Sequence, residues 1–521
     1  MTTYRARLGT AGAGLLLAVG VVACNNDKIT NINQNPNSPE DVPATTLFTN
    51  ASRNAVGRWL GTGYDAREAS FVAQHMAEQQ YPDEDRYSRL GASDTRGNFD
   101  GPFVNELEDL KKVMVKGLVT KDPGIWAPAS VLATWDFSYL TNTFGDIPYF
   151  QALAGDSIGG TTTPVYDSQK NIYADFFTKL DAASKALASA QPDLGKADPI
   201  YGGDPASWQR FANSLRARLA ITLANVDAAT ASTQLQAALA APGGVITTNS
   251  QNTIFAWPGD GVYNNPWSDF FKSRDDNRMS QTLINIMNAN GDPRTGIYAQ
   301  PLPGTTNTYA GMPNGLSAAS AGKYANIASR AGAFIFPGAT AYGTFGGTGA
   351  SFPSFIMTAA EVNFIEAEAA ERSLGGLTPA QAPGFYNAGI TASMQQWGVT
   401  DQGAIATFLA GPNVAYQGGT AGLTQIAIQK WIALFTDGGE AWTEWRRTCQ
   451  PATIKPGPSA ANSTVPRRFM YSPTEYAVNI TAVKAAATAL GTNGDSFNGR
   501  MYWDTNPTAA PTYPGAFCGA Q

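Results

Sequence analysis

Histidine is almost absent from this 521-residue sequence, which contains only His75. A Ser-His-Asp triad, a histidine-ligated zinc centre or a histidine general base would have to use this one residue, and no cysteine lies near it in sequence. A lone histidine is more often structural, so we expect His75 to belong to the core. The sequence therefore predicts no catalytic residue, no metal site and no cofactor.

Charged residues are also scarce, at 15% of the chain, well below the usual quarter. The net charge is -6, and no cluster of Lys and Arg has the pattern that follows a phosphate backbone, which argues against nucleic acid as a partner. Asn, Gln, Ser, Thr, Gly and aromatic residues are abundant instead. This composition predicts a largely neutral, polar surface that suits hydroxyl-rich ligands.

Only one long apolar run occurs, over residues 8–23, directly after two arginines. It is shorter than the roughly 20 residues that a spanning helix needs and has the layout of a secretory signal peptide. Its end resembles the lipobox of bacterial lipoproteins, with Ala23 before Cys24. We expect residues 1–23 to be removed, Cys24 to carry lipid, and residues 24–43 to form an extended tether. Ordinary cleavage near Ala23, which would leave Cys24 as a free thiol, is the alternative.

The remaining cysteines, Cys449 and Cys518, form an even pair in an oxidising compartment, and a disulfide between them is expected. Closing a loop of about 70 residues contributes roughly 4 kcal/mol in the chain-entropy model. No second linker or charge block divides the rest of the chain. Residues 44–521 are therefore predicted to form a single domain.

The apolar spacing predicts mainly helical structure. Over residues 171–190, apolar side chains recur three or four residues apart and fall on one helix face. Asp204-Pro205 is typical of a helix start, and Arg216 and Arg218 fall on the polar side of that helix.

Two further helices and one irregular stretch are expected. Thr358 and Glu361 match a capping box at the start of a helix, and another helix runs from about Thr424 to Phe435 and stops near Gly438-Gly439. Residues 243–353, rich in Gly, Pro, Asn and Thr, are expected to be mostly irregular.

Several segments, taken in order, resemble the SusD/RagB family of outer-membrane nutrient-binding lipoproteins. Each motif is short, but together they extend from Asn31 to about Trp503. They are residues 33–37, 144–149, 213–220, 360–369, the Glu-Ala-Trp and Glu-Trp-Arg-Arg-Thr motifs within 429–448, and 466–469 followed by Tyr471, Pro473, Glu475 and Asn479.

The resemblance implies a mainly α, SusD-like α/α fold of stacked tetratricopeptide-like helix pairs, with long irregular loops that build a ligand site. It also implies a lipid-anchored protein at the cell surface of the outer membrane. Its partner would be a SusC-like TonB-dependent transporter, to which it delivers an oligosaccharide or a peptide. Binding without turnover would be its function, so the chain is expected not to be an enzyme.

A sugar or peptide site needs exposed aromatic faces with amide side chains at their edges. Two polar segments offer such residues. The candidate ligand-binding residues are Tyr81, Tyr87, Asn98 and Phe99 in the first segment and Trp257, Tyr263, Asn265 and Trp267 in the second.

Two other functions stay open at this point. A surface glycan or peptide hydrolase could use Glu440 and Glu444 as a carboxylate pair, but Arg446 and Arg447 beside them favour ion pairs. A structural or adhesive lipoprotein would bind no small ligand. The acidic run at residues 83–85 is interpreted as a solvated turn, because three adjacent side chains cannot converge on one cation.

Overall fold

The computed structural model describes residues 41–155, 159–336 and 348–504. The predicted signal peptide, the lipidation site Cys24 and nearly all of the tether lie outside these residues, and so does Cys518. Cys449 is buried and takes part in a disulfide. Its pairing with Cys518 stays a prediction.

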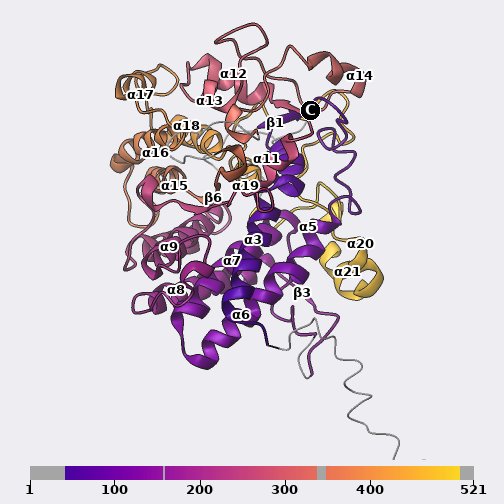
Figure 1. The fold of residues 1–521 in the computed structure, drawn as a ribbon, viewed down its shortest axis with the longest axis vertical. Helices are drawn as coiled ribbons and strands as arrows, with labels where there is room; N and C mark the ends of the chain where they lie inside the picture. The colour runs from indigo at the N-terminus through magenta and orange to yellow at the C-terminus, as the bar shows by residue number, and fades with distance from the viewer. Residues whose placement is uncertain (1–40, 156–158, 337–347, 505–521) are drawn as a thin grey trace, which may run out of the picture. The chain divides into compact units, whose positions relative to one another are not determined.

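The described chain is mainly helical, as expected (Figure 1). The longer helices are α3 (Ala44–Trp59), α6 (Leu107–Thr120), α7 (Pro123–Phe144), α8 (Gln169–Leu187), α9 (Pro205–Thr222), α10 (Ala228–Leu239), α12 (Gln281–Ala289), α15 (Ala359–Glu371), α16 (Ala382–Gln396), α17 (Gln402–Leu409), α18 (Gly419–Ala433), α19 (Gly438–Thr448) and α21 (Ile480–Ala489). The shorter ones are the π-helices η1 (Thr62–Ala69) and η2 (Pro102–Glu106), with α4 (Ser70–Val72), α5 (Arg96–Gly101), α11 (Pro266–Phe271), α13 (Thr295–Tyr298), α14 (Ala318–Ala321) and α20 (Pro473–Val478).

Short strands form three antiparallel pairs. β1 (Met76–Glu78) pairs with β5 (Asn277–Met279), β2 (Ile147–Pro148) with β3 (Tyr166–Asp167), and β4 (Thr253–Phe255) with β6 (Ser354–Met357). β4, β5 and helices α11 to α14 all come from residues 243–353. The stretch predicted to be mostly irregular is therefore partly ordered into short helices and into two strands that pair with β1 and β6.

Two predicted helix starts are confirmed by their caps. Asp204 accepts hydrogen bonds from the N–H groups of Ala206 and Ser207 at the start of α9. Thr358 accepts one from the N–H of Glu361 at the start of α15. Each side-chain oxygen satisfies an N–H that has no partner within the helix. The predicted reciprocal contact of the capping box is not made, because the Glu361 carboxylate binds Arg218 instead.

The predicted stop at Gly438-Gly439 is wrong, because these glycines begin α19. Asp437 caps that helix by accepting the N–H of Glu440. A Cβ on Gly438 would lie 2.6 Å from the backbone nitrogen of Ser70, and one on Gly439 would lie 2.7 Å from the ring of Tyr64. Glycine is thus needed for close packing of α19 on η1, and α18 ends earlier, at Ala433.

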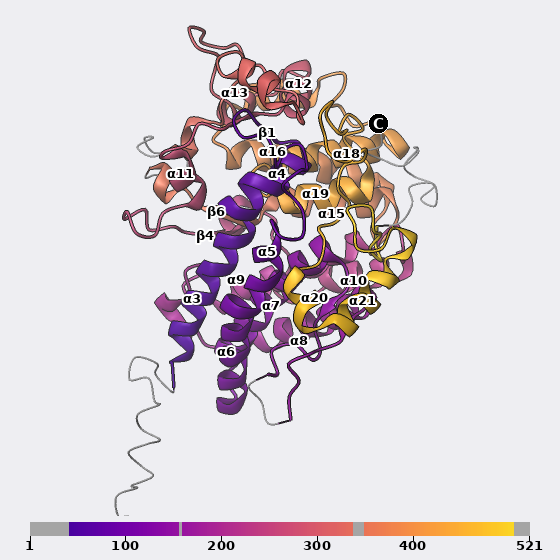
Figure 2. The same ribbon diagram turned by 90° about the vertical axis from the view of Figure 1, so that its right-hand side faces the viewer.

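Consecutive helices pack as pairs, and the pairs pack on one another. α6 contacts α7, α8 contacts α9, and α15 contacts both α16 and α18, while α7 contacts α8 and α9 contacts α15. Figures 1 and 2 show this succession within residues 44–504. One large apolar cluster lies between the pairs and includes the buried Trp208 and Trp431. No helix in the described ranges is both long enough and apolar enough to cross a membrane.

Candidate ligand-binding site

Helix α3 has one buried face and one polar face. Phe48, Ala51, Ala55 and Trp59, spaced three or four residues apart, are buried in the core. The polar residues Asn50, Arg53, Asn54 and Arg58 stand at positions i, i+3, i+4 and i+8, which places them together on the other side of the helix. Sequence reasoning missed these four residues, although their spacing was a usable signal.

A cavity of about 440 Å³ lies beside this polar face. Its opposite wall is the segment that leaves β4, which carries the predicted residues Trp257 and Tyr263. Figure 2 shows α3 beside β4 and β6. The lining residues are Thr46, Thr49, Asn50, Arg53, Pro199, Phe255, Ala256, Trp257, Pro258 and Tyr263.

A second cavity, of about 450 Å³, continues along α3 toward η1. Arg53 and Trp257 line both cavities, so the two form one elongated site, which we call the α3 groove. The other lining residues of the second cavity are Asn54, Gly57, Arg58, Gly63, Asn98, Asn105 and Glu106.

The two aromatic residues of the α3 groove are fixed in different ways. The Trp257 ring is almost fully buried, lies 4.5 Å from the Phe255 ring and donates its Nε1–H to Ser354 Oγ at 2.9 Å. Tyr263 is 44% exposed and has the Arg53 guanidinium 5.2 Å from its ring centre. Trp257 therefore forms a rigid wall, and Tyr263 offers the accessible ring.

Tyr81 lies at a separate exposed surface. It is 67% exposed in a left-handed backbone conformation, and Arg274 lies 5.6 Å from its ring and 5.8 Å from the ring of Phe270. It lines neither cavity of the α3 groove. The structure thus places Tyr81 and Tyr263, the two exposed aromatic candidates, at different surfaces.

The remaining candidates are largely buried. Tyr87, Phe99 and Trp267 are at most 2% exposed and pack in the core. Asn265 caps α11 by accepting the N–H of Trp267 and donates to Phe352 O. These four side chains have almost no surface left for a ligand in this structure, because their polar-looking segments fold back onto the apolar core.

Asn98 is also buried, yet it lines the second cavity of the α3 groove. Its Nδ2 donates to Glu68 Oε2 at 2.6 Å. This contact fixes the amide at the floor of the groove, so Asn98 joins Trp257 and Tyr263 as the predicted residues that the structure brings together.

The solvated turn predicted at residues 83–85 is only partly right. Asp85 is fully buried and accepts from Asn314 Nδ2 at 2.7 Å and from the N–H of Gly315 at 2.9 Å. Burial raises its pKa to about 7, and burial together with Glu84 and Asp85 raises the pKa of Glu78 to about 10. Within the described residues, no group of three or more His, Cys, Asp or Glu side chains is arranged to hold a metal ion.

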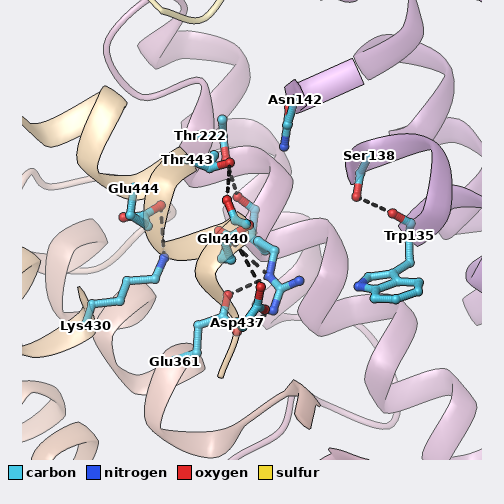
Figure 3. Close-up of polar contacts among 12 residues, drawn as sticks. Trp135, Ser138, Asn142, Thr222, Glu361, Lys430, Asp437, Glu440, Thr443 and Glu444 are labelled. Carbon is cyan, nitrogen blue, oxygen red and sulfur yellow. Dashed lines mark hydrogen bonds and ion pairs between the residues drawn. The ribbon is translucent and has the colours of Figure 1, made fainter. Parts of the chain in front are cut away.

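Glu440 and Glu444 are buried in an ionic network and line neither cavity of the α3 groove. Glu444 lies 3.1 Å from Lys430 Nζ (Figure 3). It also lies 2.6 Å from Arg447 Nη2. Burial opposes its ionisation, but the charges of Arg447 and Lys430 outweigh burial and lower its pKa to about 2. The expected ion pair is therefore present between Glu444 and Arg447, with Lys430 from α18 as a second partner. Arg446 instead donates to the carbonyl oxygens of Asn142 and Arg467.

The carboxyl groups at the start of α19 behave in the opposite way. Burial raises the pKa of Asp437 to about 7 and that of Glu440 to about 8, although the positive charge of Arg218 opposes both shifts. Tyr139 donates its hydroxyl to Asp437 at 2.7–2.8 Å, and Figure 3 shows Asp437 and Glu361 close to Glu440. Both groups serve the packing of α7, α9, α15 and α19.

His75 is structural, as expected. It is fully buried, with Nε2 2.9 Å from the carbonyl oxygen of Trp431. Because a carbonyl only accepts, Nε2 carries a hydrogen. Burial lowers the pKa of His75 to about 3.

Comparison with known proteins identifies the family of this chain. The model of the SusD-like family, described as starch-binding and associating with the outer membrane, matches residues 36–472. The chain belongs to the SusD-like family. Members of this family are non-catalytic binding proteins, and the expectation that the chain is not an enzyme agrees with this. No curated protein matches the chain by sequence.

Solved structures show the same fold. A chitin-binding SusD homologue from Flavobacterium johnsoniae is 26% identical, with a TM-score of 0.74 over 90% of this chain and 99% of that one. A chitin-binding protein at 23% identity has a TM-score of 0.75 over 89% of this chain and all of its own. A SusD homologue from Bacteroides uniformis at 24% identity has a TM-score of 0.72 over 89% of this chain and all of its own. The SusD-like fold expected from the sequence is confirmed.

Proposed function

We propose that this SusD-like chain captures an oligosaccharide in the α3 groove and delivers it to a TonB-dependent transporter. The observation that carries the proposal is the groove itself, in a family described as starch-binding. The groove is lined by an exposed tyrosine ring and by several amide side chains, the combination that holds a sugar ring by its apolar face and its hydroxyl groups.

Amide side chains line both cavities of the α3 groove. Asn50 and Asn54 lie on α3, and Asn98 and Asn105 line the second cavity. An amide offers both donors and acceptors, as a sugar hydroxyl does. Starch and chitin, named for the family and for a similar structure, are both polysaccharides. These points support an oligosaccharide over a peptide.

Calorimetric titration of the purified chain tests the proposal. Chitotetraose, maltotetraose and a tetrapeptide serve as probes. We expect saturable binding of an oligosaccharide without product formation, and Tyr263→Ala should weaken it at least about fivefold, since a central aromatic contact is typically worth more than 1 kcal/mol. Tyr81→Ala is the matched control, because Tyr81 is exposed but lies outside the groove. Loss of binding in Tyr81→Ala alone would move the site to the other surface.

Delivery requires a membrane anchor and a partner. Lipidation of Cys24 would hold the chain at the outer membrane, so Cys24→Ala should release it into the soluble fraction. Gentle detergent extraction should recover the wild-type chain together with a large barrel protein. Recovery of the chain alone would contradict the transporter part of the proposal.

A further inference from the structure

The charge of the α3 groove is unbalanced. Its lining contains two arginines, Arg53 and Arg58, and one carboxylate, Glu106. Arg58 Nε lies 2.7 Å from Glu106 Oε1, and the carboxylate is fully buried, so this pair cancels. The charge of Arg53 remains in the groove, although the chain as a whole carries a net charge of -6.

Arg53 is held in place without a counter-charge. Among the described residues no carboxylate lies within 4.0 Å of its guanidinium; its Nη2 donates to Asn50 Oδ1 at 3.1 Å and to Asn54 Oδ1 at 3.0 Å. The guanidinium carbon also lies over the Tyr263 ring, 5.2 Å from its centre. These neutral contacts fix its position but leave its charge available, with hydrogen-bond donors on Nε and Nη1.

The nearest acidic residue along the loop that carries Tyr263 is already engaged. Asp260 accepts the N–H groups of Val262 at 2.9 Å and of Tyr263 at 2.8 Å, and these bonds lower its pKa. It shapes the turn that presents Tyr263. It forms no ion pair with Arg53.

A ligand in this groove removes water from Arg53. The chemistry of the ligand determines how much of the desolvation free energy is recovered. A neutral sugar would offer Arg53 only hydroxyl oxygens as acceptors, whereas a carboxylate would make stronger, charge-assisted hydrogen bonds to it and neutralise its charge. Building on the proposed function, we propose that the α3 groove selects oligosaccharides that carry a carboxylate, the uronic acid class. Their carboxylate binds Arg53 and their sugar ring lies beside Tyr263.

Calorimetry with matched probes tests this selectivity. Tetragalacturonate should bind at least about tenfold more tightly than maltotetraose or chitotetraose, since a hydrogen bond to a charged group contributes about 1.5–3 kcal/mol. Arg53→Gln should remove this advantage, so that the charged and neutral probes bind with affinities within about twofold of each other. Arg53→Lys should keep part of it. Arg96→Gln, which removes an exposed arginine outside the groove, is the control and should change nothing.

Each other outcome overturns the inference in a distinct way. Equal binding of charged and neutral probes, unchanged by Arg53→Gln, refutes the selectivity and leaves the proposed function standing. Absence of binding by all the oligosaccharides refutes both. Preferential binding of a tetrapeptide through its C-terminal carboxylate, lost in Arg53→Gln, would assign the groove to peptides instead.

Discussion

Removing Arg218 should reveal how strongly the buried ionic network holds the helices together. Arg218 on α9 contacts Glu361 on α15 at 2.5 Å, with side chains 2% and 1% exposed. Its Nη2 also donates to the carbonyl oxygen of Ile356 at 2.9 Å. In Arg218→Met, Glu361 becomes a buried carboxylate that has lost its bidentate partner.

The expected decrease in the free energy of unfolding follows from the burial of both side chains. Breaking a buried ion pair by removing one partner costs about 3–5 kcal/mol, because the remaining charge stays desolvated. Lys185→Met breaks the pair with Asp181 at 2.6 Å, but Lys185 is 73% exposed, so that change should cost less than about 1 kcal/mol. The double variant Arg218→Met/Glu361→Leu removes both charges and should be more stable than Arg218→Met alone.

Urea unfolding at pH 7, followed by tryptophan fluorescence, measures these differences. The reasoning predicts that Arg218→Met lowers the free energy of unfolding several times more than Lys185→Met. A loss below about 1 kcal/mol for Arg218→Met, or a double variant less stable than the single one, would refute it.

The pKa of His75 lies below its value in the unfolded chain, so its contribution to stability is complete above about pH 6.5 and is lost as the pH falls toward 3. Between pH 7 and pH 5, the free energy of unfolding of the wild type, measured in urea, should fall by about 2 kcal/mol through this group. His75→Gln should lack this decrease, and an equal decrease in both proteins would contradict the assignment. Gly438→Ala should lower the free energy of unfolding by about 1–3 kcal/mol through its backbone clash, while Gly384→Ala, in open space on α16, should raise it by up to about 1 kcal/mol; similar effects of both changes would refute the packing argument. Cys518→Ser should lower it by about 2–5 kcal/mol, and mass spectrometry of an unreduced digest should find Cys449 and Cys518 in one linked peptide; separate peptides would disprove the pairing.

The sequence predicted helices correctly where their position depends on residues close in sequence. The apolar stripe of α8 and the Asp204-Pro205 start of α9 depend only on residues within a few turns, and both were predicted correctly. Gly438 was misread because glycine ends helices more often than it begins them, and the close approach of Ser70 cannot be seen in the local sequence.

Long-range contacts account for the other differences. Arg218 falls on the polar side of α9, but its partner Glu361 is 143 residues away, so the spacing could not show that this side is buried. Tyr87 and Phe99 lie in polar segments that fold onto the core. The α3 groove joins residues from the start and the middle of the chain. The sequence singled out Trp257, Tyr263 and Asn98 as candidates, but it could not show that they line one groove.

A crystal structure of the chain soaked with the best-binding tetrasaccharide tests the central claim most directly. The account predicts sugar density along α3, with a ring beside Tyr263 and hydrogen bonds to the amides of Asn50 or Asn54. Sugar density at Tyr81 and Arg274, with the α3 groove empty, would contradict it.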